Sequence, residues 1–399
     1  MVFISDPIDI AVIGAGPQAL TLVTHLLQKR KDWHARIRVL DPSGVWMSQW
    51  QRQFRAQEIP HLRSPAVHHP DPNPYELRRF AESHPQGLIP PYDRPTTAVF
   101  EGFCQDVVQR WKLGSLVMPA QVGRIRSLRP GFELDLSDGR ILQARRVVLA
   151  KGAGIPALPS WSLGLKHPPE RLCHSSQVSL PSLSLDGETV VIVGGGLTSG
   201  HLALGAVKRG ARVILMTRRK AREKLFDTDP GWLGPKYLKG FEQEVCWQTR
   251  RQHVQLARDG GSLTPELLTQ IRSLTHQGSL VLQESCEISG AMWQMGGWQI
   301  RCLDGKPLRA DRIWLATGSR VDIADERVLD PVLAAHPVAT VQGLPILDQH
   351  LRWQGCELFV MGGLAALQVG PVARNLSGAR MAAQKIVPAL AKPSLRGGN

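Results

Sequence analysis

Two glycine-rich stretches have the residue types and spacing to bind the phosphates of a dinucleotide. The first begins at Ile8 and sets Gly14, Gly16 and Ala19 in a G-x-G-x-x-A pattern that also contains Pro17. In such a loop the first glycine permits a tight turn, the second lets the backbone approach a pyrophosphate, and the third small residue allows close packing of helix on strand. The N-terminus of the helix then faces the phosphates.

An acidic residue completes the first unit. Asp41 lies 22 residues beyond Ala19, at the end of the second expected strand. A carboxylate in this place accepts hydrogen bonds from the hydroxyls of an adenosine ribose. The first unit therefore predicts an FAD site, with Gly14, Gly16, Pro17, Ala19 and Asp41 as its binding residues.

The second stretch ends differently. It places Gly194, Gly196 and Ser199 behind an apolar run, but its second strand ends in Arg218 and Arg219 instead of an acid. An arginine pair binds a phosphate dianion through charge-assisted, bidentate hydrogen bonds. The 2′-phosphate of NADP is such a dianion, so the second unit predicts an NADPH site. One dinucleotide would carry electrons, and the other would deliver hydride to it.

The elements that hold these loops follow from the apolar runs and turn residues. Residues 8–41 and 188–219 each read as strand, glycine turn, helix and strand. The stretches "RVVLAKG" and "RIWLATG" read as equivalent buried strands that each close a domain, and "ELFVMGG" as one more buried strand. Residues 42–95 are rich in Trp, His, Arg and Pro. So many prolines exclude long helices and central strands there, and favour a cover over a cofactor or substrate.

Composition limits the remaining choices. The chain has 399 residues, 43% of them hydrophobic and 21% charged, which is typical of a soluble protein of two or three domains. No run of about 18 apolar residues predicts a membrane span, and the early first strand leaves no room for a leader peptide, so we expect a cytoplasmic protein. The six cysteines form no CxxC pair, and the net charge of +14 comes without a nucleic-acid-binding motif.

The order of these segments resembles that of flavoproteins with two dinucleotide-binding domains. Within that group, "GPQAL", "LRSP" and "CHSSQV" are most similar to the L-lysine/L-ornithine N-hydroxylating monooxygenase family. The resemblance implies an α/β protein with two Rossmann-like domains, in which the NADPH domain is inserted into a discontinuous FAD domain. It implies an FAD part at 1–160, an NADPH domain at 161–309 and a second FAD part at 310–390. Separately, the residues of the tail at 391–399 predict that it is disordered.

The same resemblance implies further residues near the cofactors. It places Trp46 and Trp50 near the flavin, His174 at the junction between the domains, and Gly318, Gly363 and Gly370 in the closing loops. The start of the last helix would face the flavin, and its dipole would favour negative charge on the reduced ring. The chain departs from the family at Lys151, where Thr is usual, and at "VHHPDPNPYELRRF", where substrate-recognition residues are expected.

The predicted function is a FAD-dependent, NADPH-using monooxygenase of the N-hydroxylating type. Its substrate would be a small amine or another soft nucleophile, and no catalytic side chain is assigned. Two alternatives stay open: a reductase that passes electrons to a quinone or a protein, and a flavin-binding regulatory protein without turnover. We expect no metal, because His68, His69 and Asp71 lie among prolines without helical spacing. We expect no nucleic acid or integral membrane contact, and a homo-oligomer is possible.

Overall fold

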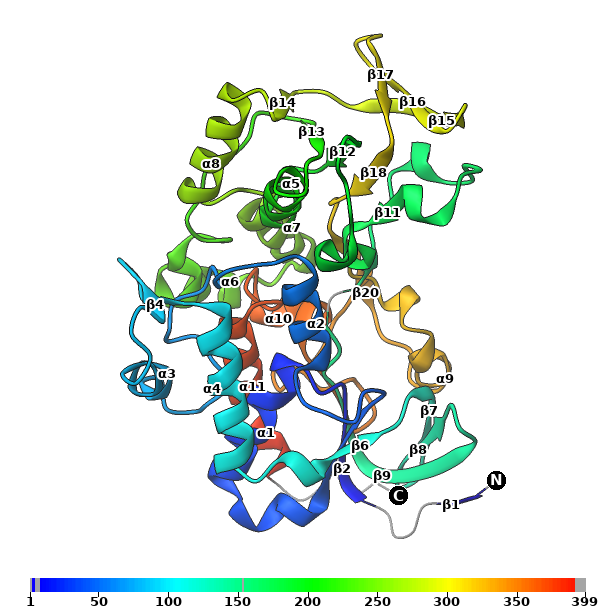
Figure 1. The fold of residues 1–399 in the computed structure, drawn as a ribbon. Coiled ribbons are helices and arrows are strands. Elements are labelled where there is room, and N and C mark those ends of the chain that lie inside the picture. Colours follow the sequence, from blue (N-terminus) through cyan, green and yellow to red (C-terminus); the bar gives the residue numbers. More distant parts are fainter. Residues whose placement is uncertain (1, 4–7, 153, 392–399) are drawn as a thin grey trace.

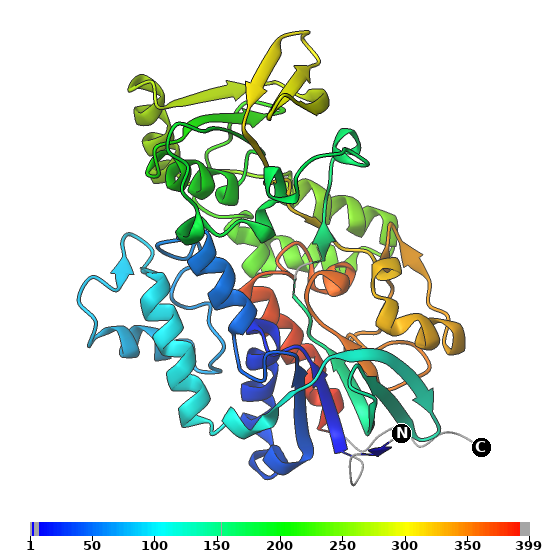
Figure 2. The same cartoon turned by 45° about the vertical axis from the view of Figure 1, so that its right-hand side comes forward.

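The computed structural model describes residues 2–3, 8–152 and 154–391. Figures 1 and 2 show two lobes, of which the lower combines the N-terminal part of the chain with its C-terminal part. The middle of the chain forms the upper lobe. Apart from Ala391, the expected tail at 391–399 lies outside the described residues.

The lower lobe is built on an eight-stranded sheet. Its parallel part runs in the order β6–β3–β2–β9, and β22 pairs in parallel with β9. These strands are β6 (Val117–Pro119), β3 (Ile37–Asp41), β2 (Ile8–Ile13), β9 (Arg140–Leu149) and β22 (Leu358–Val360). Because β22 comes from near the C-terminal end of the chain, the lower lobe is discontinuous, which confirms the predicted fold class.

Strand β9 belongs to two arrangements along its length. Its first half forms an antiparallel meander with β7 (Val122–Leu128) and β8 (Gly131–Leu136), and it also pairs with β1 (Val2–Phe3). Its second half is buried between β2 and β22. Strands covered on both faces are apolar throughout, as "VVL" is here.

The upper lobe holds a second parallel sheet, in the order β11–β18–β12–β13–β14. Its strands are β11 (Leu172–His174), β18 (Arg312–Leu315), β12 (Thr189–Val193), β13 (Arg212–Thr217) and β14 (Leu280–Glu284). A three-stranded antiparallel sheet projects at its outer edge in Figure 1, formed by β15 (Ile288–Gln294), β16 (Gly297–Cys302) and β17 (Pro307–Ala310).

The domain boundary expected between residues 309 and 310 needs correction. Strand β18 follows that boundary, yet it pairs with β11 and β12, and Trp314 packs in the apolar core of the upper lobe. The chain returns to the lower lobe only after β18. There β19 (Ser319–Arg320) pairs with β10 (Ile155–Pro156), so the two connecting segments run side by side.

Helices cover both sheets. In the lower lobe α1 and α11 pack against each other behind the sheet, and in the upper lobe α5 packs on α8. The long helices are α1 (Pro17–Lys29), α4 (Thr97–Arg110), α5 (Leu197–Val207), α7 (Trp247–Arg258), α8 (Pro265–His276) and α11 (Leu376–Leu390). Within the part of the chain that is described, no helix is both long and apolar enough to cross a bilayer.

The remaining elements are short. The Pro-rich segment 42–95 contains only short helices and strands, as its prolines predict. The short helices are α2 (Ser48–Ala56), α3 (Glu76–Ala81), α6 (Pro235–Gln243), α9 (Asp330–Ala335) and α10 (Ala366–Val369), and the short strands are β4 (Leu88–Ile89), β5 (Arg94–Pro95), β20 (Thr340–Val341) and β21 (Leu344–Pro345).

Candidate cofactor-binding cleft

One large cavity, of about 1280 Å³, joins the two lobes. Its walls include both glycine loops, the Pro-rich segment, the closing strands and the start of α11. From the lower lobe come Gly14, Gly16, Pro17, Asp41, Trp50, Arg63, His68, Gly363, Arg374 and Asn375; from the upper lobe come Gly196, Leu197, Phe226, Asp227, Thr228, Gly261 and Ser262. The cavity therefore connects the two sites that the sequence predicts separately.

The first glycine loop opens freely into this cavity. Gly14 has φ +98°, and a Cβ there would lie 3.0 Å from the Ala150 carbonyl oxygen, so both conformation and space favour glycine. A Cβ on Gly16 would meet nothing within 4 Å, which leaves the approach to the loop clear. Gly16 is the N-cap residue of α1 and has no side chain to cap the helix. The first backbone N–H groups of α1 therefore lack a side-chain acceptor and favour an anion.

Asp41 is fixed beside that loop. One carboxylate oxygen accepts the Ala15 backbone N–H at 3.0 Å, and the other accepts the Ser43 hydroxyl at 2.6 Å. These bonds hold Asp41 at the carboxyl end of β3, where it lines the cavity. Its remaining acceptor capacity suits the ribose hydroxyls that the sequence predicts. Ala19 lies behind the loop, fully buried in the helix–sheet contact.

The second glycine loop has the same form but a different surrounding. Gly194 has φ +147°, and a Cβ there would collide with the backbone of Ala316. Ser199 is buried and its hydroxyl donates to the Gly196 carbonyl at 2.7 Å, so it supports the loop from behind. A Cβ on Gly196 would lie 3.5 Å from the Cα of Gly261. The second loop is therefore covered by a segment of the upper lobe.

The two arginines at the end of β13 differ in their partners. Arg218 is exposed and forms no ion pair with any residue in the described ranges. Arg219 donates from Nη1 to the Asp259 carboxylate at 3.0 Å, and Arg222 also pairs with Asp259. Neither Arg218 nor Arg219 lines the large cavity itself; both follow β13 beside it.

The two tryptophans that we expect near the flavin, Trp46 and Trp50, lie in different environments. Trp46 is buried in the core, where its Nε1 donates to the Leu113 carbonyl at 3.0 Å. It is not part of the cavity wall, because the apolar ring and its one donor are both satisfied inside the lobe, and its place near a flavin stays a prediction. Trp50 does line the cavity and stacks on Phe54, with ring centroids 4.0 Å apart.

Of the three glycines of the closing loops, only one lines the cavity. Gly363 lines the cavity, and a Cβ there would lie 3.3 Å from Cγ of Arg374. Gly318 lies outside the wall, and its carbonyl accepts a hydrogen bond from His174 Nε2 at 3.0 Å. Gly370 ends α10 with φ +90° and lies behind Phe241. Gly318 and Gly370 are thus turn glycines with positive φ outside the cavity wall, and their cofactor contacts stay a prediction.

Two arginines of the wall were not selected from the sequence, although both lie in quoted motifs. Arg63, of "HLRSP", donates to the Leu225 carbonyl at 2.8 Å and to the Ser262 hydroxyl at 2.9 Å, and so ties the lower lobe to the upper. Arg374, of "GPVARNLSGA", donates to the Ser319 hydroxyl at 2.7 Å. Burial lowers the pKa of both guanidiniums. Their roles depend on contacts across the lobes, which a local motif does not show.

The histidines near the cleft are held neutral. Burial lowers the pKa of His68 and of His69 to about 4. His69 Nδ1 accepts the Asp71 backbone N–H at 3.2 Å, and Asp71 accepts from Trp111 Nε1 at 3.1 Å. These hydrogen bonds hold the Pro-rich segment in its conformation. His174 accepts the Ser176 N–H at 3.2 Å and caps a turn at the junction between the lobes.

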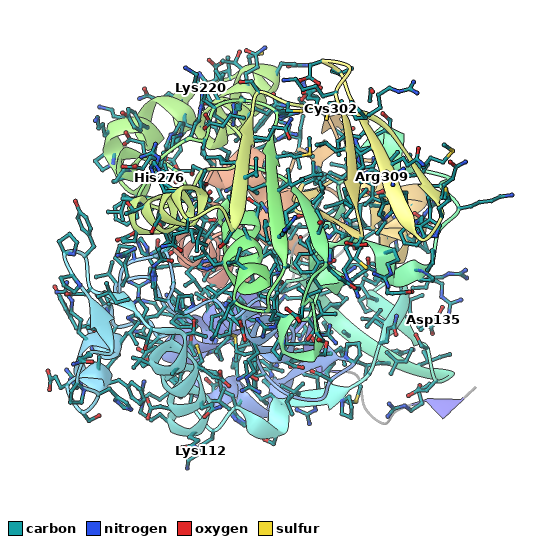
Figure 3. The ribbon with its side chains drawn as sticks, turned by 45° about the horizontal axis from the view of Figure 1, so that its top comes forward. Lys112, Asp135, Lys220, His276, Cys302 and Arg309 are labelled. Atoms are coloured by element: carbon teal, nitrogen blue, oxygen red, sulfur yellow. The ribbon has the colours of Figure 1, made fainter. Side chains whose placement is uncertain are left out.

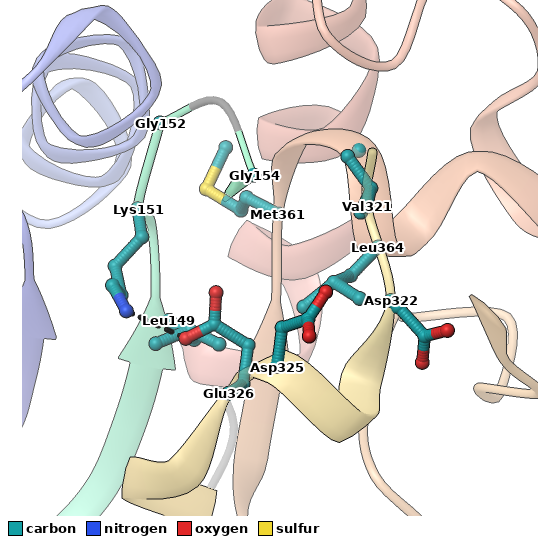
Figure 4. A pocket seen from close by; sticks show the side chains of 11 residues that line it. Leu149, Lys151, Gly152, Gly154, Val321, Asp322, Asp325, Glu326, Met361 and Leu364 are labelled. Carbon is teal, nitrogen blue, oxygen red and sulfur yellow. Dashed lines mark hydrogen bonds and ion pairs between the residues drawn. The ribbon is translucent and has the colours of Figure 1, made fainter. Parts of the chain in front are cut away.

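Lys151 lies at the wall of the large cavity, but its ammonium group pairs with an acid. Figure 4 shows its ammonium group facing Glu326, with Asp325 beside that residue, in the wall of a small neighbouring pocket. The Lys151 Nζ–Glu326 Oε2 distance is 2.6 Å, and Arg320 pairs with Asp325 at 2.8 Å. The charge of Lys151, which stands in place of the usual Thr, is thus neutralised by Glu326, from the segment that returns to the lower lobe after β18.

A group of possible metal ligands lies far from the cleft. Cys286, Cys302 and Asp304 bring their ligand atoms within 4.8 Å of one another at the outer edge of the upper lobe, where Figure 3 labels Cys302. Burial raises the pKa of Cys302 to about 12, so its thiol is protonated. Both sulfurs pack in an apolar cluster with Trp298 and Ile300. This group offers three ligands, whereas structural zinc sites use four.

Comparisons with known proteins agree with this architecture. A family model described as FAD-NAD(P)-binding matches residues 11–154, and one described as pyridine nucleotide-disulphide oxidoreductase matches residues 86–259. No curated protein sequence matches the chain.

Solved structures match nearly the whole chain. The reduced form of ornithine hydroxylase (PvdA) from Pseudomonas aeruginosa matches with a TM-score of 0.79 and 16% identity, covering 96% of this chain and 99% of that one. Ornithine N-hydroxylase KtzI from Kutzneria sp. 744, with reduced FAD, NADP+ and L-ornithine, gives 0.78 and 18%, covering 97% and 99%. The FAD-bound cadaverine monooxygenase DfoA from Erwinia amylovora gives 0.77 and 14%, covering 99% and 98%. The chain therefore has the fold of the N-hydroxylating flavin monooxygenases, which confirms at the level of the fold the resemblance inferred from its sequence.

Proposed function

We propose that this protein is a FAD-dependent, NADPH-using monooxygenase that hydroxylates the nitrogen of a small primary amine. The observation that carries the proposal is the single cavity that runs from the open first glycine loop and Asp41 to the second glycine loop. Both dinucleotides could thereby reach one shared space. Solved structures of similar fold include hydroxylases of ornithine and cadaverine, which favours an amine substrate here.

The residues of the cleft fit the two cofactors. Gly16 and the N-terminus of α1 would hold the FAD pyrophosphate, and Asp41 would hold the adenosine ribose. When bound, FAD supplies the redox chemistry, with hydride from NADPH and activation of dioxygen. The N-terminus of α11, preceded by Arg374, lines the same cavity and favours negative charge there.

The chain's own residues would shape the reaction by exclusion and charge. Segments from both lobes, including Trp50 and Phe226, line the cavity and, with both cofactors bound, would limit the water that reaches it. Arg63 and Arg374 face the cavity without a carboxylate partner among the described residues. Nearby cations disfavour the protonated form of an amine, and only the neutral amine has the lone pair that accepts oxygen.

A substrate panel tests this proposal. Purified protein with FAD and NADPH would be given ornithine, lysine and cadaverine, with product analysed by mass spectrometry. We expect one of these or a related small amine to yield a hydroxylamine with coupled oxygen uptake. Oxidation of NADPH that needs a quinone, and never gives an oxygenated amine, would instead support the reductase alternative.

A further inference from the structure

The segment Asp259–Ser262, here called the covering segment, lies directly against the second glycine loop. A Cβ on Gly261 would lie 2.7 Å from the Cα and N of Gly196, closer than side-chain carbons approach backbone atoms. In a dinucleotide-binding loop the second glycine is the residue that a pyrophosphate approaches. The covering segment therefore fills the space beside the second glycine loop. The corresponding space beside Gly16 in the first loop is empty.

A cluster of arginines holds the covering segment in place. Asp259 follows α7 in a left-handed conformation with φ +35°, and its carboxylate accepts from Arg219 and pairs with Arg222. The Asp259 carbonyl also accepts from Arg219. From the lower lobe, Arg63 donates to the Ser262 hydroxyl at 2.9 Å. Both ends of the segment are thus tied to cations.

The arginines that hold Asp259 are the ones that a 2′-phosphate would need. Arg219 and Arg222 follow β13, the strand whose end lies beside the adenosine ribose in this fold. A phosphate monoester carries nearly two negative charges and three acceptor oxygens, whereas Asp259 carries one charge and two oxygens. The side chains of Arg219, Arg222 and Asp259 are 36%, 41% and 38% exposed. Such partly exposed pairs exchange at low cost.

We propose that Asp259 is an internal competitor of the NADPH 2′-phosphate. Without nucleotide, it engages Arg219 and Arg222 and keeps the covering segment over the second glycine loop. A 2′-phosphate takes these arginines, and the loop becomes open to the pyrophosphate. The inference rests on the proposed NADPH site, and it assigns different roles to neighbouring arginines: Arg219 both closes the loop and binds phosphate, while Arg218 only binds phosphate.

Nucleotide binding, measured by calorimetry on the FAD-loaded protein, tests these roles without turnover. Asp259→Asn keeps the side-chain size and suits the left-handed backbone. It should bind both NADP+ and NAD+ about two- to fivefold more tightly, because the competing ion pairs are weakened. Arg219→Ala should weaken NADP+ binding but tighten NAD+ binding. The matched control, Arg218→Ala, should weaken NADP+ binding and leave NAD+ binding unchanged.

The outcomes separate this inference from the proposed function. If the unmodified protein binds NADP+ but Asp259→Asn binds it equally or more weakly, Asp259 is no competitor and the inference fails, while the NADPH site stands. If Arg219→Ala leaves NAD+ binding unchanged, Arg219 does not hold the covering segment over the second glycine loop, and the inference again fails while the NADPH site stands. If neither the unmodified protein nor Asp259→Asn binds either nucleotide, the proposed NADPH site itself is wrong.

Discussion

The two glycine loops share one motif but not one environment. A Cβ on Gly16 would have no neighbour within 4 Å, whereas a Cβ on Gly196 would lie 3.5 Å from the Cα of Gly261. The first loop is thus open for a resident cofactor, and the second is covered where a nucleotide must enter and leave. The comparison teaches that a loop motif establishes the capacity to bind phosphate, while segments distant in sequence establish access to it.

The largest effect expected from this comparison is at the first loop. Gly16→Val should give a folded protein without FAD, because its Cβ meets no protein atom within 4 Å and the side chain would project into the path of the pyrophosphate. The measurement is flavin absorbance per protein after purification. Gly114→Val is a matched control, since a Cβ at Gly114 also meets nothing within 4 Å and lies outside the cavity. Full flavin content in Gly16→Val would show that the first loop does not hold FAD.

A valine at the second loop should separate the two sites. Gly196→Val should retain FAD and lose NADP+ binding, because its branched carbons would occupy the space between the loop and Gly261. Flavin absorbance and calorimetry with NADP+ measure the two properties on one preparation. Loss of FAD together with NADP+ would mean that the two loops are not independent.

A smaller effect is expected at the end of β13. Arg218→Ala should raise the KM for NADPH by about 10–100-fold, since hydrogen bonds to charged groups contribute roughly 1.5–3 kcal/mol. The KM for NADH should stay nearly constant, and FAD content should not change, because Asp41 lies in the other lobe. Equal KM values for the two nucleotides in the unmodified protein would remove the basis for this arginine's role.

The smallest effect concerns the helices behind the loops, which each bury one histidine. Burial lowers the pKa of His25 in α1 and of His201 in α5 to about 4 from an ordinary 6.5. The unfolded chain therefore takes up protons first, and stability is lost as pH falls from about 6.5 towards 4, by about 1 kcal/mol per histidine at pH 5.5. Urea unfolding at pH 7 and pH 5.5 measures this loss.

The histidines also provide a matched pair of variants. His201 Nε2 is buried without a hydrogen-bond partner among the described residues, whereas His25 Nδ1 donates to the Thr21 carbonyl at 2.8 Å. Both His201→Leu and His25→Leu should reduce the pH dependence of unfolding. Only His25→Leu should also lose stability at pH 7, because it removes a satisfied hydrogen bond. An unchanged pH dependence in both variants would contradict burial as the cause.

Local features of the fold and site were predictable from the sequence. Gly14, Gly16 and Asp41 belong to one strand–turn–helix–strand unit, so their spacing alone places them together. The lobe that a strand joins was not predictable in this way: β18 is the strand of the closing sequence "RIWLATG", yet it pairs with β12 of the upper lobe. Trp46 and Trp50 illustrate the same limit: four residues apart, one faces the core and the other the cavity. The roles of Arg63 and Asp259 depend on partners more than 35 residues away.

The most direct test of the proposed cleft is a reduction and reoxidation experiment on the purified protein. FAD-loaded protein would be mixed with NADPH or NADH without oxygen, and flavin absorbance followed by stopped flow. Oxygen and a small primary amine would then be added and the product quantified. We predict faster bleaching with NADPH than with NADH, and one hydroxylamine formed per NADPH consumed. Absence of bleaching by either nucleotide, or bleaching that yields only hydrogen peroxide with every amine tested, would contradict the account.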